Sequence, residues 1–128
     1  MAEEKKGKTL LVVDDDPALR ELLHDVLLKD GYQVIVAASG DAAIAAAAAR
    51  RFDGVLLDVM MPGTDGYHVA LELTKNRRIE ESKIIIMTAR DTVREKGIAM
   101  MSGAIATLQK PFTVSELSAK LAEVFGTP

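Results

Sequence analysis

The chain of 128 residues contains no cysteine, which excludes disulfides and thiolate metal sites and fits a reducing compartment. No apolar run approaches the ~18 residues that a membrane-spanning helix requires. The net charge of −3 gives no electrostatic support for binding nucleic acid or an anionic membrane. These absences favour a cytoplasmic protein with neither nucleic acid nor membrane among its partners.

The amino acids that are present are those of an ordinary globular domain. Hydrophobic residues make up 48% of the chain and charged residues 27%, close to the average for such domains. The length predicts one domain that buries a substantial core. Residues 1–8 are charged and lack an apolar signal core. We expect a solvated tail over 1–8, one folded domain over 9–126, and no output domain.

Five short apolar runs alternate with helical patterns along the chain. Buried strands separated by helices indicate a parallel sheet with helices on its faces. The strands are expected at 9–13, 34–37, 52–57, 83–87 and 105–108. The helices are expected to start at Asp16-Pro17, Ser39-Gly40-Asp41, about Gly66, Asp91 and Thr113.

The helices differ in how strongly the sequence specifies them. The first carries an apolar stripe at helical spacing, expected to face a core: Leu19, Leu22, Leu23, Val26 and Leu27. The second is almost all alanine over Ala42–Ala49, which suits a helix lying close to a sheet. The fourth, over residues 91–101, is weakened by Gly97. In the last, Thr113 and Glu116 form a capping box, and four residues are expected to point inward: Val114, Leu117, Leu121 and Val124.

Polar side chains follow several of the apolar runs directly. They are three carboxylates, a hydroxyl and an ammonium: Asp14, Asp15, Asp58, Thr88 and Lys110. The carboxyl ends of parallel strands share one edge of the sheet, which is where such sheets bind ligands. We therefore expect these five side chains to meet in one small acidic pocket.

The chemistry of this pocket suits a phosphoryl group. Two carboxylates ~4 Å apart repel by about 4 kcal/mol at an effective dielectric constant of about 20, and a divalent cation relieves that repulsion. Oxygen ligands without thiol or imidazole suit Mg²⁺ or Mn²⁺. A hydroxyl can donate to a phosphoryl oxygen, an ammonium neutralises its charge, and a carboxylate is a competent nucleophile.

The residues around these positions resemble the receiver domain of two-component response regulators, of the kind found in chemotaxis regulators. The resemblance covers Thr9 to about Phe125. It rests on four segments in order: Val12-Val13-Asp14-Asp15, Asp58-Val59-Met60-Met61-Pro62-Gly63, Thr88-Ala89 and Lys110-Pro111-Phe112. The family implies a flavodoxin-like (βα)5 fold, a doubly wound parallel sheet of strand order 2-1-3-4-5.

The resemblance also implies a role for each residue of the pocket. Asp58 is expected to be the phosphoacceptor, and Thr88 and Lys110 to bind the phosphoryl group. The expected Mg²⁺ ligands are Asp14, Asp15, Asp58 and the backbone carbonyl of Met60. The Lys110-Pro111 peptide is expected to be cis. The phosphoryl donor implied is a histidine kinase or a histidine phosphotransfer protein, with an unknown downstream protein partner and a monomer or weak homodimer as the assembly.

One position departs from the family pattern. Most members carry tyrosine or phenylalanine three residues before the lysine, and this chain carries Thr107. The usual relay between the threonine and that aromatic residue is therefore in question. In the family, the residues at the positions of Met60 and Arg90 influence how long the phosphoryl group persists.

Two other functions fit the same residues. A phosphate-independent interaction module is the main alternative, because Thr107 interrupts the expected relay. A haloacid-dehalogenase-like phosphatase also uses aspartate, threonine and lysine at strand ends. It would need a second acidic pair after Lys110, whereas Glu116 and Glu123 lie on a predicted helix. The leading prediction is a phosphoacceptor switch that assists its own phosphorylation and dephosphorylation and is otherwise no enzyme.

Overall fold

Five parallel strands form one sheet in the computed structural model, in the order β2-β1-β3-β4-β5. The residues described are 8–75, 83–90 and 92–126. The predicted tail therefore lies outside them except for Lys8, as does Asp91, the expected start of the fourth helix. The strands are β1 Thr9–Val13, β2 Gln33–Ala37, β3 Gly54–Asp58, β4 Ile84–Thr88 and β5 Ala106–Gln109. The predicted fold class is confirmed.

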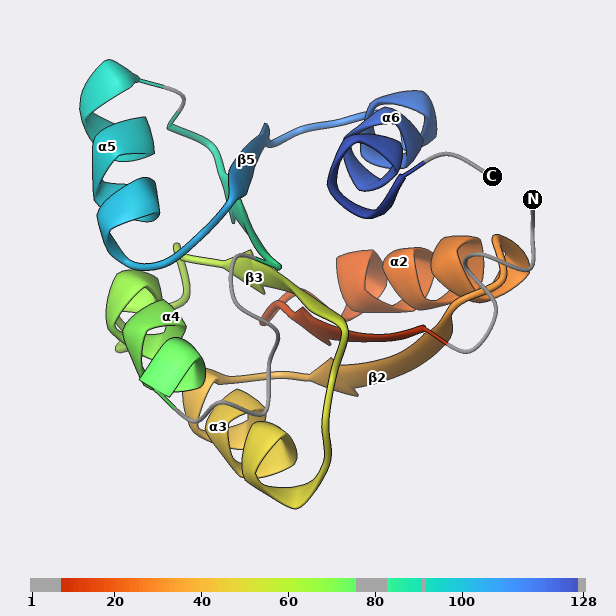
Figure 1. Cartoon of the computed structure of the whole chain (residues 1–128), viewed down its shortest axis with the longest axis horizontal. Coiled ribbons are helices and arrows are strands. Elements are labelled where there is room, and N and C mark those ends of the chain that lie inside the picture. Colours follow the sequence, from red (N-terminus) through yellow and green to blue (C-terminus); the bar gives the residue numbers. More distant parts are fainter. Residues whose placement is uncertain (1–7, 76–82, 91, 127–128) are drawn as a thin grey trace.

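Helices cover both faces of the sheet. They are α2 Pro17–Lys29, α3 Gly40–Ala49, α4 Gly66–Lys75, α5 Val93–Met101 and α6 Val114–Phe125. Figure 1 shows α2 and α6 on one side of the sheet and α3, α4 and α5 on the other. Within the described part of the chain, no helix has both the length and the apolar character needed to cross a membrane.

The helices begin where side chains cap their free backbone N–H groups. Asp16 accepts hydrogen bonds from the N–H groups of the first turn of α2, and Pro17 occupies the first helical position, where its missing N–H has no cost. Ser39 caps α3 and Thr92 caps α5, so α5 begins two residues after the expected start. The capping box of Thr113 with Glu116 is confirmed.

Alternation along the strands divides the core into two layers. Leu11, Val13 and Leu57 pack with the buried residues of α3 and α4, including Ala43 and Ala47 of the alanine-rich helix. Residues of the opposite face pack with α2 and α6: Leu10, Val12, Leu56, Ile85 and Met87. The sheet is thus buried on both faces, as expected of a doubly wound fold.

Two residues predicted to face the core are exposed instead. Leu22 of α2 and Val114 of α6 are about half exposed, at 52% and 51%. Both line an apolar cleft of about 390 Å³ between α2, α6 and the segment Lys110–Phe112. The apolar stripe of α2 is wider than the surface that the sheet covers, and Val114 lies in the first turn of α6, so neither side chain reaches the core.

The third strand starts at Gly54 rather than at the predicted Phe52. Asp53 accounts for the difference, because its N–H donates to Thr9 O at 2.8 Å while its carboxylate Oδ2 accepts from Thr9 N at 2.7 Å. A side-chain oxygen thus takes the place of a strand carbonyl just before β3.

Replacing Gly66 and Gly97 with alanine should have opposite effects on stability. A Cβ on Gly66, at the start of α4, would lie 2.3 Å from Val59 Cα, whereas a Cβ on Gly97 in α5 would meet no atom within 4 Å. We expect Gly66→Ala to lower the free energy of unfolding by about 1–3 kcal/mol through overpacking. Its matched control, Gly97→Ala, should raise it by up to about 1 kcal/mol.

Urea denaturation of both variants beside the parent protein measures the two effects. Equal changes in the two variants would show that the contact between Gly66 and Val59 does not limit the packing of α4.

Candidate functional site

The register of the strands brings the predicted site residues to one edge of the sheet. Val13 at the end of β1 lies beside Leu57 of β3, which places Asp14 next to Asp58. The end of β4 at Thr88 lies beside Gln109 of β5, so Lys110 follows directly. Helices α2 and α4 leave β1 and β3 toward opposite faces (Figure 1), and such a switch point opens a crevice at the carboxyl ends of the strands.

Three carboxylates line this crevice. One oxygen from each of Asp14, Asp15 and Asp58 lies within 4.8 Å of the others. Asp14 and Asp58 are buried, at 0% and 2% exposed, while Asp15 is exposed. The cluster is therefore a concentrated negative charge with one side open to solvent.

Lys110 supplies the compensating positive charge. Its Nζ donates to Asp14 Oδ2 at 2.7 Å and lies 3.4 Å from Asp58 Oδ2. Burial alone would lower the pKa of Lys110, but the hydrogen bond to Asp14 and the charges of Asp14 and Asp58 outweigh it and raise the pKa. The side chain therefore stays an ammonium. The Lys110-Pro111 peptide that follows is cis, as expected.

Asp58 is held by its own loop. The N–H of Met60 donates to Asp58 Oδ1 at 2.9 Å, a turn made by the side chain two residues back. Burial raises the pKa of Asp58, as does the charge of Asp14; the Met60 hydrogen bond and Lys110 lower it, and the net direction is upward. A cation bound beside Asp58 would therefore stabilise the ionised form of this carboxylate.

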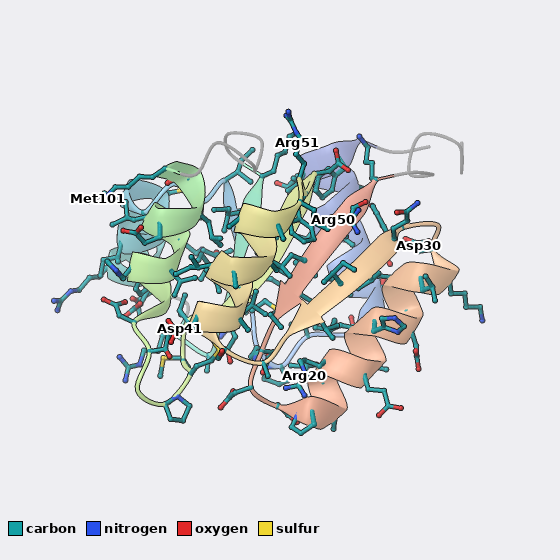
Figure 2. All side chains as sticks on the ribbon, turned by 90° about the horizontal axis from the view of Figure 1, so that it is seen from below. Arg20, Asp30, Asp41, Arg50, Arg51 and Met101 are labelled. Carbon is teal, nitrogen blue, oxygen red and sulfur yellow. The ribbon has the colours of Figure 1, made fainter. Side chains whose placement is uncertain are left out.

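Asp14 is positioned by groups that the sequence pattern did not single out. The N–H of Asp16 donates to Asp14 Oδ1 at 2.9 Å, and Arg20 Nη1 donates to the backbone carbonyl of Asp14 at 2.9 Å. Figure 2 shows Arg20 on α2 and Asp41 at the start of α3 at the same end of the molecule, with Arg51 at the opposite end. Arg20 lies six residues after Asp14 and belongs to no recognisable motif, so the sequence did not identify this contact.

Thr88 is buried and engaged with the loop that follows it. Its Oγ1 accepts a hydrogen bond from the N–H of Arg90 at 3.0 Å. The Arg90 side chain lies 3.9 Å from Glu95 Oε1, and Tyr67 Oη donates to Glu95 Oε2. Glu95 and Tyr67 lie on different helices, 28 residues apart, and no sequence signal connects them.

The two remaining predicted positions lie at the rim of the site or away from it. The side chain of Met60 is 49% exposed. Thr107 is half-buried on β5, opposite Ile86 of β4. It lines a polar cleft with residues of α5 and α6, including Lys96, Glu116 and Lys120. No large ring fills this place on the strand.

The chain belongs to the family of response regulator receiver domains, whose pattern it matches over residues 10–122. It is 42% identical over 112 residues to the response regulator MprA of Mycolicibacterium vanbaalenii, an alignment that covers 88% of this chain and 48% of that protein. The family resemblance inferred from the motifs is thereby confirmed, and the haloacid-dehalogenase-like alternative is set aside.

Solved structures place the fold in the same family. The chemotaxis protein CheY4 of Vibrio cholerae superposes with a TM-score of 0.87 at 30% identity, covering 91% of this chain and 98% of that one. The response regulator TrrA of Thermotoga maritima, solved in complex with Mg²⁺ and BeF, superposes with a TM-score of 0.78 at 34% identity, covering 91% and 98%.

The chain spans about half the length of the curated relatives it matches, such as MprA. The activity of the remaining half is a property of those longer proteins. The expectation that nucleic acid is not a partner, made from net charge, therefore finds no support in these relatives.

The raised pKa of Asp58 predicts how stability depends on pH. Because its folded-state pKa lies above the unfolded value of 3.8, the folded state binds more protons between the two values. The free energy of unfolding therefore falls as pH rises through that window. We expect Asp58→Asn to be more stable than the parent protein at pH 7 without divalent metal, with a difference that shrinks toward pH 4.

Urea denaturation in EDTA over that pH range tests this expectation. Asp41→Asn, which changes an exposed carboxylate on α3, is the matched control and should show no such pH-dependent gain. An Asp58→Asn variant less stable than the parent at pH 7 would show that the carboxylate cluster is not strained by its charge.

Proposed function

We propose that the chain is a phosphorylation-controlled switch of a two-component system, with Asp58 as the phosphoacceptor. The observation that carries the proposal is the buried Asp58 carboxylate, clustered with Asp14 and Asp15 and 3.4 Å from the ammonium of Lys110. Phosphoryl transfer requires mainly positioning and charge neutralisation, and these groups supply both.

A divalent cation, Mg²⁺ or Mn²⁺, fits the carboxylate cluster. The donor set consists of oxygens that lie within 4.8 Å of one another, with Asp15 open to solvent, and hard cations prefer such ligands while keeping water positions open. The three carboxylates would hold the ion together with the Met60 carbonyl. The bound ion supplies positive charge for the phosphoryl oxygens. The Mg²⁺ and BeF complex of TrrA, a similar protein, supports this assignment.

The proposed transfer forms one bond and breaks one bond. A carboxylate oxygen of Asp58 forms a bond to phosphorus while the bond from phosphorus to the imidazole nitrogen of a phosphohistidine breaks, and the imidazole leaves with the electron pair. Lys110 and the Thr88 hydroxyl then face the new phosphoryl oxygens. Lys110 can do so by giving up part of its contact with Asp14, since its ammonium has three donors.

The donor we infer is a histidine kinase or a histidine phosphotransfer protein, as in the family. The chain acts as an acceptor that assists its own phosphorylation and dephosphorylation, and signals by binding a protein partner. Met60 lies two residues after Asp58, and Arg90 lies two residues after Thr88. Both are proposed to limit the approach of water to the phosphoryl group.

The first prediction from this proposal concerns the site of phosphorylation. Acetyl phosphate with Mg²⁺ should add one phosphoryl group, detected by intact-protein mass measurement, and Asp58→Asn should lose it. The matched control is Asp53→Asn, because Asp53 precedes the same strand, β3, at the opposite edge of the sheet. That variant should be modified like the parent protein.

The same measurement separates the proposal from its alternative. A phosphoryl group that persists in Asp58→Asn would contradict the assignment of the acceptor. A parent protein that takes up no phosphoryl group, despite binding Mg²⁺, would favour the phosphate-independent interaction module.

The second prediction concerns the metal. Asp15→Ala should weaken Mg²⁺ binding at least about tenfold, because carboxylates dominate the ligation of this ion. Isothermal titration of the variant and the parent measures the change. Asp41→Ala, which removes an exposed carboxylate on α3, is the control and should leave the affinity unchanged. Equal Mg²⁺ affinity in Asp15→Ala and the parent would contradict the ligand set.

A further inference from the structure

Helix α5 is held to the rest of the molecule by few apolar contacts. Ala99 is its only buried residue. Val93 and Met101 are 90% and 84% exposed, and Figure 2 shows Met101 on the outer surface. Gly97 lies in open space within the helix. Elements with so little buried surface have low local stability. The polar contacts of α5 therefore contribute a large share of the free energy that holds the helix in place.

One of these contacts joins the first turn of α5 to the first turn of α4. Tyr67 Oη donates to Glu95 Oε2 at 2.5 Å, and the Glu95 side chain is only 18% exposed. Burial raises the pKa of Tyr67, and so does the hydrogen bond to Glu95. The phenol therefore keeps its proton at physiological pH and remains a hydrogen-bond donor to Glu95.

One end of this contact is packed closely against the residue that follows the proposed phosphoacceptor. Tyr67 follows Gly66, whose backbone packs against Val59 so closely that a Cβ would lie 2.3 Å from Val59 Cα. Val59 in turn follows Asp58. Tyr67 therefore projects from the first turn of α4, which this close contact holds against the loop after Asp58.

The other end leads back to Thr88. The second oxygen of Glu95, Oε1, lies 3.9 Å from Arg90 Nη1, and the N–H of Arg90 donates to Thr88 Oγ1 at 3.0 Å. A movement of that hydroxyl toward a group on Asp58 pulls the Arg90 backbone with it or breaks the hydrogen bond. Either change alters the restraint that Thr88 places on Arg90, whose side chain faces Glu95.

We propose that Tyr67, Glu95 and Arg90 form a latch that holds α5 against α4 in the unphosphorylated protein, and that engagement of Thr88 by a phosphoryl group releases it. Tyr67 and Glu95 are positioning residues in this scheme, since neither touches the phosphoryl group. The proposal deepens the proposed function and rests on it. It gives this chain a path from Thr88 to α5 that needs no aromatic residue at position 107.

The test compares Tyr67→Phe, which removes only the hydroxyl, with Tyr32→Phe, the same change at a tyrosine before β2, at the opposite edge of the sheet. In the absence of any ligand, amide hydrogen exchange across residues 93–101 should be at least about threefold faster in Tyr67→Phe than in the parent protein. Tyr32→Phe should leave exchange in that segment unchanged. Equal protection of α5 in Tyr67→Phe and the parent overturns the latch.

The second measurement is the affinity for beryllofluoride in the presence of Mg²⁺. If the latch opposes the phosphorylated arrangement, removing it should tighten binding by about threefold or more, since the ligand no longer has to shift that equilibrium. Glu95→Gln, which keeps an acceptor but removes the charge that faces Arg90, should change the affinity in the same direction. A merely structural hydrogen bond would loosen α5 without tightening the binding of the ligand.

The outcomes separate the latch from the proposed function. Faster exchange in α5 with unchanged affinity in both variants overturns the coupling to Thr88. A parent protein that binds no beryllofluoride contradicts the proposed function, while the exchange measurement without ligand still decides whether Tyr67 holds α5. In the parent, beryllofluoride should alter protection mainly between Ala89 and Gly103.

Discussion

The ammonium of Lys110 between two buried carboxylates is the interaction on which the rest of the site depends. Its contacts with Asp14 and Asp58 tie together the loops after β1, β3 and β5. Removing Lys110 would leave the buried carboxylates of Asp14 and Asp58 uncompensated, which is strongly destabilising. Charge repulsion remains even so, because three carboxylates face the crevice against the one ammonium of Lys110. The proposed divalent cation would neutralise that excess negative charge.

The surroundings of Thr88 connect the loop after β4 to helices α4 and α5. Thr107 leaves β5 without a large ring, and a threonine side chain is small and stiff about its first torsion. The contacts of Arg90, Glu95 and Tyr67 instead join the loop after β4 to two helices. Helix α5 has one buried residue, and it is the element that we propose these polar contacts hold in place. A phosphoryl group can shift the position of such an element only if its interactions differ between two states.

Much of the fold was predictable because the decisive signals are local. Apolar runs bounded by turn residues located all five strands, and capping residues such as Asp16 and Thr113 located the helix starts. The predictions of strand bounds and of buried residues were wrong where tertiary contacts overrode the local pattern. Asp53 delays the start of β3 by bonding to Thr9 with its side chain, and Leu22 remains exposed although its spacing matches the buried stripe of α2.

The sequence by itself determined that Asp14, Asp15, Asp58, Thr88 and Lys110 end or follow parallel strands, and a parallel sheet must then bring them to one edge. Only the tertiary structure decided which atoms meet there. It placed Lys110 against Asp14 rather than against Asp58 alone, set Arg20 on the Asp14 carbonyl, and joined Tyr67 to Glu95 across two helices. Such contacts depend on the packing angles and distances of whole elements, which no local pattern encodes.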